Sequence, residues 1–420
     1  MKLAILGYGV EGQSVEKYFK THPYEDTPAN EIDITVFDNF DDSKLSELEL
    51  ENFDVVFRSP SVRLHPEIKT NWDSITNYFF RHCAARIIGV TGTKGKGTTC
   101  TMAAALLESL GEKVHIVGNI GRPALEELDK IKKDDVVVYE LSSFQLWDLK
   151  KSPTVSVVLR IEPDHLDVHK DFDDYLNAKS NIVKHQGEED TAIYYLDNSC
   201  SVNIGKSGKG KSFSYPLDIS KELLEILDSL NVPGAHNREN AEAALLAVYT
   251  YENPDSNLEE FLRTNLSNFK TALSNYVSLP HHLEFVRELN GVKYYDDNFA
   301  SAFPALDVAI SAFGTQPVVI IAGGKDRGLD LSKVKDRLAS AGNIVKVILI
   351  GETKEKLATG MPKNRCILAD DLKTAVETAQ QIAEEKSAYV IMSPGAPSFD
   401  MFKNFKDRGE KFQKIVKGLK

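Results

Sequence analysis

Short β-rich runs alternate with amphipathic helical stretches along almost the whole chain. This alternation is typical of parallel α/β units, in which a helix returns the chain between neighbouring strands. Several of the β-rich runs end in glycine or in a polar residue, which is where ligands bind in open parallel sheets. We therefore predict an α/β fold with its functional residues at the carboxyl ends of strands. The predicted strands are Leu3–Leu6, Ile34–Phe37, Val55–Arg58, Ile87–Thr91, Val114–Val117, Val136–Glu140, Val155–Leu159, Ala192–Leu196, Lys293–Asp296, Val318–Ala322, Val345–Ile350 and Ala388–Met392.

Two breaks interrupt this alternation. One lies near residues 83–86, before a new strand begins at Ile87, and the other lies at Pro280. Proline interrupts regular structure because its ring fixes the backbone and removes a hydrogen-bond donor. The breaks divide the chain into three parts of ordinary domain size. The predicted domains are residues 1–85, 86–279 and 280–420.

The bulk composition narrows the functional classes. Apolar residues make up 42% and charged residues 27% of the chain, as in soluble globular proteins. The formal net charge of -12 argues against a nucleic-acid partner, because proteins that bind nucleic acids present a basic surface. It does not argue against phosphorylated substrates, because backbone N–H groups and lysines cradle phosphate locally.

The cysteines and the start of the chain predict a cytoplasmic protein. Cys83, Cys100, Cys200 and Cys366 lie far apart and form no CxxC pair, so they predict neither a zinc site nor a disulfide framework. The sequence starts directly on a predicted strand, without the apolar core and cleavage site of a signal peptide. No apolar run reaches the ~18 residues that a membrane-spanning helix needs. We expect a cytoplasmic monomer with no membrane partner.

A first glycine loop, Gly7-Tyr-Gly9-Val-Glu-Gly12, follows a predicted strand and opens a predicted helix. Glycines at this spacing allow a tight turn and bring the N–H groups of the helix start close to a diphosphate. Asp38, at the end of the second predicted strand, lies where an acidic residue binds a ribose hydroxyl. The motif alone does not separate an NAD cofactor from a UDP-linked substrate. Glycines also occur at such turns only to pack a helix against a strand.

A second glycine loop is more informative. It joins a buried strand to a helix start and supplies lysines and hydroxyls. Backbone N–H groups of such a loop wrap a triphosphate, a lysine neutralises it, and a threonine reaches Mg²⁺. It is not a strict Walker A motif, because Val90 replaces the first glycine and Gly97 occupies the usual Ser/Thr position; Thr98 is therefore the candidate metal-side hydroxyl. The candidate ATP-binding residues are Gly92, Thr93, Lys94, Gly95, Lys96, Gly97, Thr98 and Thr99.

Acidic and imidazole side chains follow two later strands. Glu140 ends one predicted strand, where a carboxylate can face the nucleotide loop and hold Mg²⁺, which prefers oxygen ligands. Asp164 and His165 follow the next strand, and this position favours a role near a metal over simple packing. Lys179 lies in a helical stretch further on and would by itself be interpreted as a surface lysine.

These motifs belong to a set that spans nearly the whole chain. The set comprises Gly118-Asn-Ile-Gly121, Glu140-Leu-Ser-Ser-Phe-Gln-Leu146, Asp164-His165, Ala178-Lys179, Gly234-Ala-His-Asn237-Arg-Glu-Asn240, Leu279-Pro-His281 and Ser393-Pro-Gly-Ala-Pro-Ser398-Phe-Asp-Met-Phe-Lys-Asn-Phe405-Lys-Asp-Arg-Gly409. On these residues the chain resembles the Mur ligase family of peptidoglycan synthesis, and within it the D-glutamate-adding branch. The resemblance implies a Rossmann-like N-terminal domain for a UDP group, a central P-loop ATPase domain with a parallel sheet, and a Rossmann-like C-terminal domain for the incoming amino acid.

The resemblance also implies roles for individual residues. Lys96 would contact the transferred phosphate, Thr98 and Glu140 would bind one Mg²⁺, and Glu140, His165 and a carbamylated Lys179 would serve a second. The residues near the UDP group would be Gly7, Gly9, Gly12, Asp38 and Ser59. Asn119 and Ser142 would position the muramoyl-alanine end. The adenosine contacts would be Asn237, Asn240 and Asp297, and the D-glutamate contacts would be Ser301, Arg327, Ser398 and Phe405.

The chain departs from the family pattern at three positions. Gly97 replaces the usual hydroxyl residue, which makes this loop more similar to that of folylpolyglutamate synthases. His282 stands where the family usually has an arginine that contacts the γ-phosphate side. Phe299, within Asp297-Asn-Phe-Ala-Ser301, replaces the lysine of the common Asp-Ser-Lys-Ala-Thr and so removes a charge.

The implied function is ATP-dependent ligation of D-glutamate to UDP-N-acetylmuramoyl-L-alanine through an acyl phosphate, with release of ADP and phosphate. Three alternatives remain open from the residues. The Gly97 loop favours a folate-type ligase that adds L-glutamate. His282 and Phe299 would fit a catalytically silent binding protein of the same fold. The first glycine loop would fit an NAD-dependent dehydrogenase, which leaves the second loop unexplained.

Overall fold

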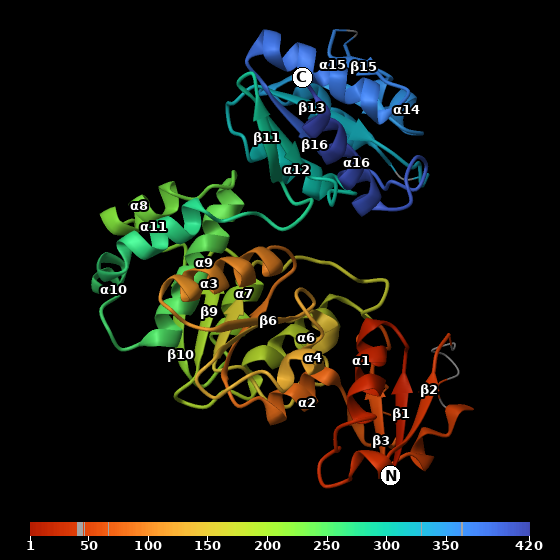
Figure 1. The fold of residues 1–420 in the computed structure, drawn as a ribbon, viewed down its shortest axis with the longest axis vertical. Coiled ribbons are helices and arrows are strands. Elements are labelled where there is room, and N and C mark those ends of the chain that lie inside the picture. The colour runs from red at the N-terminus through yellow and green to blue at the C-terminus, as the bar shows by residue number, and fades with distance from the viewer. Residues whose placement is uncertain (40–44, 46, 66, 329, 363) are drawn as a thin grey trace. The chain divides into compact units, whose positions relative to one another are not determined.

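The computed structural model describes residues 1–420 except 40–44, 46, 66, 329 and 363. The chain divides into two compact units (Figure 1). The first unit comprises residues 1–229 and 239–273, and the second comprises residues 230–238 and 274–420. The prediction of three domains is not tested by this division and stays a prediction.

The first unit begins with a parallel four-stranded sheet of order β2-β1-β3-β4 (Figure 1). The central strands β1 and β3 are almost wholly buried, as expected for apolar runs covered on both faces. Aromatic side chains of the flanking helices, among them Phe19 and Phe79, complete its core. The elements are β1 (Lys2–Leu6), α1 (Val10–Phe19), β2 (Asp33–Phe37), β3 (Val55–Arg58), β4 (Trp72–Asp73) and α2 (Ile75–His82), with short 3-10 helices at Ala29–Glu31 and Leu50–Asn52.

A second sheet in the same unit has six parallel strands in the order β10-β9-β8-β5-β7-β6. The chain leaves β5 toward β6 on one side and leaves β8 toward β9 on the other, so the carboxyl ends of β5 and β8 form a topological switch point. The strands are β5 (Arg86–Thr91), β6 (Val114–Gly118), β7 (Val136–Glu140), β8 (Val155–Val158), β9 (Thr191–Tyr195) and β10 (Lys211–Tyr215). The helices are α3 (Lys96–Ser109), α4 (Ala124–Leu128), α5 (Ser143–Leu146), α6 (Phe172–Lys184), α7 (Ser199–Gly205), α8 (Lys221–Asp228), α9 (Ala235–Glu252), α10 (Leu258–Thr264) and α11 (Leu266–Ser274). Residues 235–238 of α9 and Ser274 of α11 belong to the second unit.

The second unit holds a six-stranded sheet of order β11-β12-β16-β13-β14-β15, in which β11 pairs antiparallel and the other pairs are parallel. One face packs on α12, α13 and α14, and the opposite face packs on α15 and α16. The strands are β11 (Glu284–Leu289), β12 (Val292–Asp296), β13 (Val318–Gly323), β14 (Ile344–Ile350), β15 (Cys366–Leu368) and β16 (Tyr389–Met392). The helices are α12 (Phe303–Ser311), α13 (Ser332–Ser340), α14 (Lys354–Ala358), α15 (Leu372–Lys386) and α16 (Phe405–Gly418).

The predicted α/β fold with parallel sheets is confirmed, and every predicted strand is present within one residue at either end. The sequence did not predict β4, β10, β11 or β15, each of which lies at an edge of its sheet. No helix in the described parts of the chain is both long enough and apolar enough to cross a membrane.

Candidate active site

The second glycine loop connects β5 to α3. Gly95 is the N-cap of α3 with φ of +85°, and a Cβ there would lie 2.5 Å from the Oδ1 atom of Asn240, so only glycine fits. No side chain caps this helix start, which leaves its N–H groups available to an anion. The Lys96 ammonium group donates to the backbone oxygens of Gly92 and Thr93, both at 3.1 Å. The loop backbone therefore surrounds the Lys96 ammonium group, as in a phosphate-binding loop.

Glu140 ends β7 between β5 and β6. Its Oε1 atom accepts a hydrogen bond from Asn119 Nδ2 at 3.2 Å, and its Oε2 atom is buried without a partner among the described residues. Burial raises the pKa of Glu140, while Lys96 and Lys179 lower it. A buried carboxylate oxygen without a partner is costly unless a cation or donor completes it, so this atom fits a Mg²⁺ ligand.

Lys179 on α6 is only 1% exposed. Its ammonium nitrogen donates to Thr91 Oγ1 at 3.2 Å and to the Gly92 carbonyl at 2.9 Å, and lies 4.7 Å from the centre of the Tyr175 ring. Burial lowers the pKa of Lys179 well below its usual value, and nearby Lys96 lowers it further. Burial therefore favours the neutral amine, which is the form that reacts with carbon dioxide.

The loop after β8 reaches the same end of the sheet. Asp164 Oδ2 pairs with Lys94 of the second glycine loop at 3.1 Å, a contact that the sequence did not predict. His165 adopts a left-handed backbone with φ of +54°, and its ring packs edge-on against Phe144 with centroids 5.1 Å apart. The Thr98 hydroxyl, at the start of α3, has no hydrogen bond among the described residues. The structure thus brings the predicted residues of three strand ends to the switch point.

The first glycine loop lies at the carboxyl edge of the four-stranded sheet. A Cβ at Gly12 would lie 2.1 Å from the Gly7 carbonyl oxygen, so the helix start can approach the strand only with glycine. Ser59 donates to the Gly7 carbonyl at 2.7 Å, and Asp38 accepts from the N–H of Tyr8 at 3.2 Å. Gly9 is the N-cap of α1 and provides no side-chain cap. The structure brings all five predicted UDP-site residues of this region together.

The four-residue helix α5 follows Glu140 closely and contacts the first glycine loop. Ser142 and Gln145 form a capping box at its start, immediately after Glu140. Gln145 Nε2 also donates to Glu11 Oε1 on α1 at 2.9 Å. Arg58, at the end of β3, donates to the Phe144 carbonyl at 2.9 Å and pairs with Asp148 at 2.8 Å. Sequence reasoning missed Glu11, Arg58 and Asp148, because nothing local in the sequence pairs residues so far apart.

Three loops at the carboxyl ends of β12, β13 and β16 gather in the second unit. Asp297 accepts from Ser393 Oγ at 2.6 Å and from the Leu283 N–H at 3.2 Å. The N–H groups of Gly323 and Lys325 bond to carbonyls of the loop after β16, each at 2.8 Å. Burial raises the pKa of Asp297 to about 8. The loops are therefore linked to each other, and the predicted adenosine contact Asp297 lies between two of them.

The predicted amino-acid contacts lie on or beside these loops. Ser301 is exposed and Ser398 is buried. Arg327 is exposed and has no ion pair among the described residues, whereas its neighbour Lys325 pairs with Glu352 at 2.7 Å. The unpaired guanidinium can receive a carboxylate.

The two departures from the family pattern in this unit contact each other. The ring of His282 stacks on Phe299 at 4.1 Å between centroids and 25° between planes. Phe299 also meets Phe405 edge-on at 5.5 Å. Burial lowers the pKa of His282 and so favours its uncharged form. Two stacked, uncharged rings therefore stand at positions where the family usually has an arginine and a lysine.

A titratable cluster beside these loops is saturated by its own contacts. His281 Nδ1 lies 2.7 Å from Asp296 Oδ2, and Gln413 donates to that oxygen and to Glu284, both at 2.9 Å. Asn298 donates to the other Asp296 oxygen at 2.7 Å. These hydrogen bonds hold the loop after β12 in place, and they account for the close approach of His281, Glu284 and Asp296 without a metal ion.

The two predicted asparagines of the family motif on α9 lie in different units. Asn240, in the first unit, accepts from Thr99 Oγ1 of α3 at 3.3 Å. Asn237, in the second unit, donates to the Pro233 carbonyl at 2.6 Å. Only Asn240 is therefore seen beside the second glycine loop.

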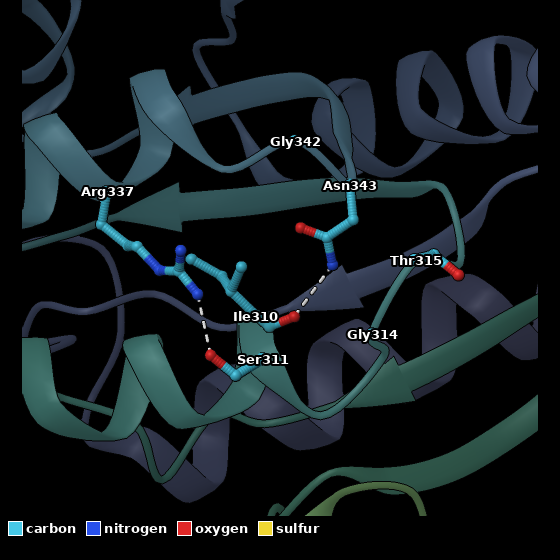
Figure 2. Close-up of a pocket in the computed structure, with 7 residues that line it drawn as sticks. All are labelled: Ile310, Ser311, Gly314, Thr315, Arg337, Gly342 and Asn343. Atoms are coloured by element: carbon cyan, nitrogen blue, oxygen red, sulfur yellow. Dashed lines mark hydrogen bonds between the residues drawn. The ribbon is translucent and has the colours of Figure 1, made fainter.

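A pocket of ≈ 370 Å³ lies at the opposite, amino end of the sheet in the second unit (Figure 2). Arg337 Nη2 donates to Ser311 at 2.8 Å across it, and Asn343 donates to the Ile310 carbonyl at 2.9 Å. Since ligands of parallel α/β sheets bind at carboxyl ends, this pocket is not part of the candidate site.

Comparison with known proteins supports the resemblance to the Mur ligase family. Residues 90–248 match the family described as the Mur ligase middle domain. A relative from Clostridium tetani, named UDP-N-acetylmuramoylalanine–D-glutamate ligase, is 33% identical over 100% of this chain and 97% of its own length. The chain belongs to the Mur ligase family. A second relative of the same name, from Clostridium perfringens, is 34% identical over 88% of this Mur ligase and 84% of its own length.

Solved structures share the Mur ligase fold. The UDP-N-acetylmuramate–alanine ligase of Thermotoga maritima has a TM-score of 0.59 at 16% identity and covers 100% of both chains. The folylpolyglutamate synthase of Mycobacterium tuberculosis has a TM-score of 0.55 at 13% identity and covers 80% of this chain and 94% of its own. At these identities the likeness concerns the fold alone.

Proposed function

We propose that this Mur ligase activates the carboxylate of UDP-N-acetylmuramoyl-L-alanine with ATP and joins it to D-glutamate, as a step of peptidoglycan precursor synthesis. The names of full-length relatives that share a third of its residues support this substrate pair. The observation that carries the chemistry is the meeting of Lys96, Lys179 and the unsatisfied Glu140 carboxylate beside an uncapped helix start.

The reaction needs activation because a carboxylate is a poor electrophile. Transfer of the terminal phosphoryl group of ATP converts the substrate carboxylate into an acyl phosphate and leaves ADP. Such transfer depends mainly on in-line positioning and charge neutralisation, which the α3 N–H groups and Lys96 would supply. The amine of the bound amino acid then attacks the acyl carbon, and phosphate leaves. The loops of this site would also exclude water, which otherwise hydrolyses the acyl phosphate.

Mg²⁺ would be held by Thr98 and Glu140 at one position and by Glu140, His165 and a carbamylated Lys179 at a second. When bound, the ions neutralise the charge of the phosphate groups. The Glu140 oxygen that has no partner among the described residues, and the Thr98 hydroxyl in the first turn of α3, support the first position. The burial of Lys179, which lowers its pKa and so favours the neutral amine, supports carbamylation, which would convert a buried base into an oxygen ligand.

The remaining roles follow the same pattern. The first glycine loop with Asp38 and Ser59 would bind the UDP group, and Asn119 and Ser142 would position the muramoyl-alanine end. The adenosine would contact Asn237, Asn240 and Asp297, and D-glutamate would contact Ser301, Arg327, Ser398 and Phe405. We propose domains 1–85, 86–279 and 280–420 for these three tasks, in a cytoplasmic monomer.

Phosphate release from ATP and Mg²⁺ in the presence of UDP-N-acetylmuramoyl-L-alanine tests the proposal. The amino acid is varied across D-glutamate, L-glutamate and other amino acids. We expect release to require D-glutamate and to fall by about 100-fold or more in Lys96→Ala. Release with a different amino acid would move the acceptor and keep the ligase chemistry. Amino-acid-dependent release that survives in Lys96→Ala would contradict the proposed mechanism.

A further inference from the structure

Glu11 is an acidic residue inside a loop that otherwise suits an anion. It lies in the first turn of α1, between Gly9 and Gly12 of the first glycine loop. The helix start has no side-chain cap, so its N–H groups are free to bind a diphosphate. An ionised carboxylate at this place would repel that diphosphate and compete with it for the same N–H groups.

The surroundings of Glu11 favour a neutral acid. Its Oε1 atom accepts one hydrogen bond, from Gln145 Nε2 at 2.9 Å, and its Oε2 atom has no hydrogen bond among the described residues. No lysine, arginine or histidine in the described parts of the chain forms an ion pair with it. Burial raises the pKa of Glu11 to about 7, against smaller lowering effects of Gln145 and Arg58.

The described titratable groups near Glu11 do not form an ion pair with it. Arg58 is paired with Asp148 at 2.8 Å and is almost fully buried. Tyr139 of β7, the other titratable neighbour, has its pKa raised, so its phenol is neutral near pH 7. Elsewhere on α1, Glu16 pairs with Lys20 at 2.8 Å.

The helix α4 also packs on α1, and its acidic residues contact the C-terminal end of α1. Glu126 lies 3.5 Å from Lys17, and Asp129 accepts from Tyr18 at 3.3 Å. Both contacts lie on the last two turns of α1, away from Glu11. The protonation of Glu11 is thus governed by burial, Gln145, Arg58 and whatever binds to the loop.

We propose that Glu11 binds the diphosphate of the nucleotide sugar as a neutral acid, donating its hydroxyl to a phosphate oxygen while Gln145 holds its other oxygen. A protonated carboxyl has one donor and one acceptor, which matches these two partners. The inference rests on the proposed function, because it takes the ligand of the first glycine loop to be a UDP-linked substrate. It adds a specific residue and a bound proton to that site.

The consequence is that substrate binding takes up a proton above pH 7. In the free chain Glu11 titrates near pH 7, and a nearby diphosphate raises its pKa further because like charges disfavour the carboxylate. From pH 6 to pH 8 the protonated fraction of the free chain falls by about tenfold, and the affinity falls with it. At pH 8 about one proton is taken up for each substrate bound.

Isothermal titration calorimetry of the full chain with UDP-N-acetylmuramoyl-L-alanine measures both quantities. Titrations at pH 6, 7 and 8, each in two buffers of different ionisation enthalpy, give the affinity and the number of protons. The ligand is suited to this test, because its diphosphate is a diester without a group that titrates in this range. We expect binding to be about tenfold weaker at pH 8 than at pH 6, with proton uptake at pH 8.

Two variants separate Glu11 from other causes. Glu11→Gln keeps a donor and an acceptor without a titrating group, so its affinity should stay within about twofold across this range, without proton uptake. Glu16→Gln is the matched control on the same helix; the pKa of Glu16 is lowered by its bonds to Lys20 and Tyr8, so this variant should keep the pH dependence of the wild type. Thermal unfolding of both variants at pH 8 checks that they are folded.

Four outcomes would overturn the inference. A pH dependence of the affinity that persists in Glu11→Gln would exclude the neutral acid. Loss of binding in this variant at every pH, while it remains folded, would exclude it too. Wild-type binding that does not change between pH 6 and pH 8 would do the same and leave the proposed function standing. Absence of substrate binding by the wild type at every pH would overturn both proposals together.

Discussion

The positive charge of Lys179 is disfavoured by its surroundings. Its amine is buried next to Lys96, and its hydrogen-bond partners are the neutral oxygens of Thr91 and Gly92. Burial and Lys96 lower the pKa of Lys179, and the smaller raising effects of Asp164 and Glu140 do not offset them. Carbamylation would remove the repulsion from Lys96 by turning a positive group into a negative one.

Lys179→Ala should lower amino-acid-dependent phosphate release by about 100-fold. Depleting dissolved carbon dioxide should lower the wild-type rate, and added bicarbonate should restore it. Lys184→Ala, at the exposed end of the same helix, is the matched control and should keep the wild-type rate. Full activity of Lys179→Ala, or a wild-type rate that ignores bicarbonate, would show that Lys179 only packs.

The candidate site could be predicted from sequence where chemistry is local. The glycine loops, Glu140 and Asp38 follow directly from strand ends, and the structure places them there. The partners of these residues could not be predicted, because Glu11 meets Gln145 and Lys94 meets Asp164 only through the fold. Burial of Lys179 was also hidden, because a lone lysine on a helix carries no sign of its environment.

At the scale of elements, whether a strand could be predicted from the sequence depended on its position in the sheet. Interior strands such as β5 and β13 are buried along nearly their whole length, so they show as continuous apolar runs. The missed strand β10 is an edge strand whose first two residues are exposed, and β11 is another whose six residues are partly or fully exposed. Edge strands keep polar residues on their open side, which hides the pattern.

The short helix α5 depends on a buried ion pair. The side chains of Arg58 and Asp148 are 1% and 7% exposed, and Arg58 also holds the Phe144 carbonyl of α5. Asp148→Ala would leave the guanidinium buried and unpaired, so it should lower the free energy of unfolding by about 3–5 kcal/mol. Chemical denaturation followed by circular dichroism measures this loss.

The matched control for that pair is Glu25→Ala. Glu25 pairs with Arg81 at 3.0 Å, but the two side chains are 47% and 35% exposed. Solvent screening should limit its effect to less than about 1 kcal/mol. Equal losses in the two variants would show that burial of the Arg58–Asp148 pair contributes nothing special.

At the scale of the whole molecule, the residues of the proposed site fall in both units. The chain passes between them after residues 229, 238 and 273. Both glycine loops and Lys179 lie in the first unit, whereas Arg327 and the linked loops around Asp297 lie in the second. Each unit has its own buried core, so each can unfold on its own.

We therefore expect differential scanning calorimetry to resolve two transitions, of which the nucleotide sugar alone raises only one. A ligand stabilises the part of a protein that binds it, by about 2.7 kcal/mol at a hundred times its dissociation constant. Gly12→Val should abolish the shift, because any Cβ there would lie 2.1 Å from the Gly7 carbonyl oxygen and close the loop. Limited proteolysis in the same samples assigns the shifted transition to the first unit. A single cooperative transition, or equal shifts of both, would mean that the two units do not unfold independently.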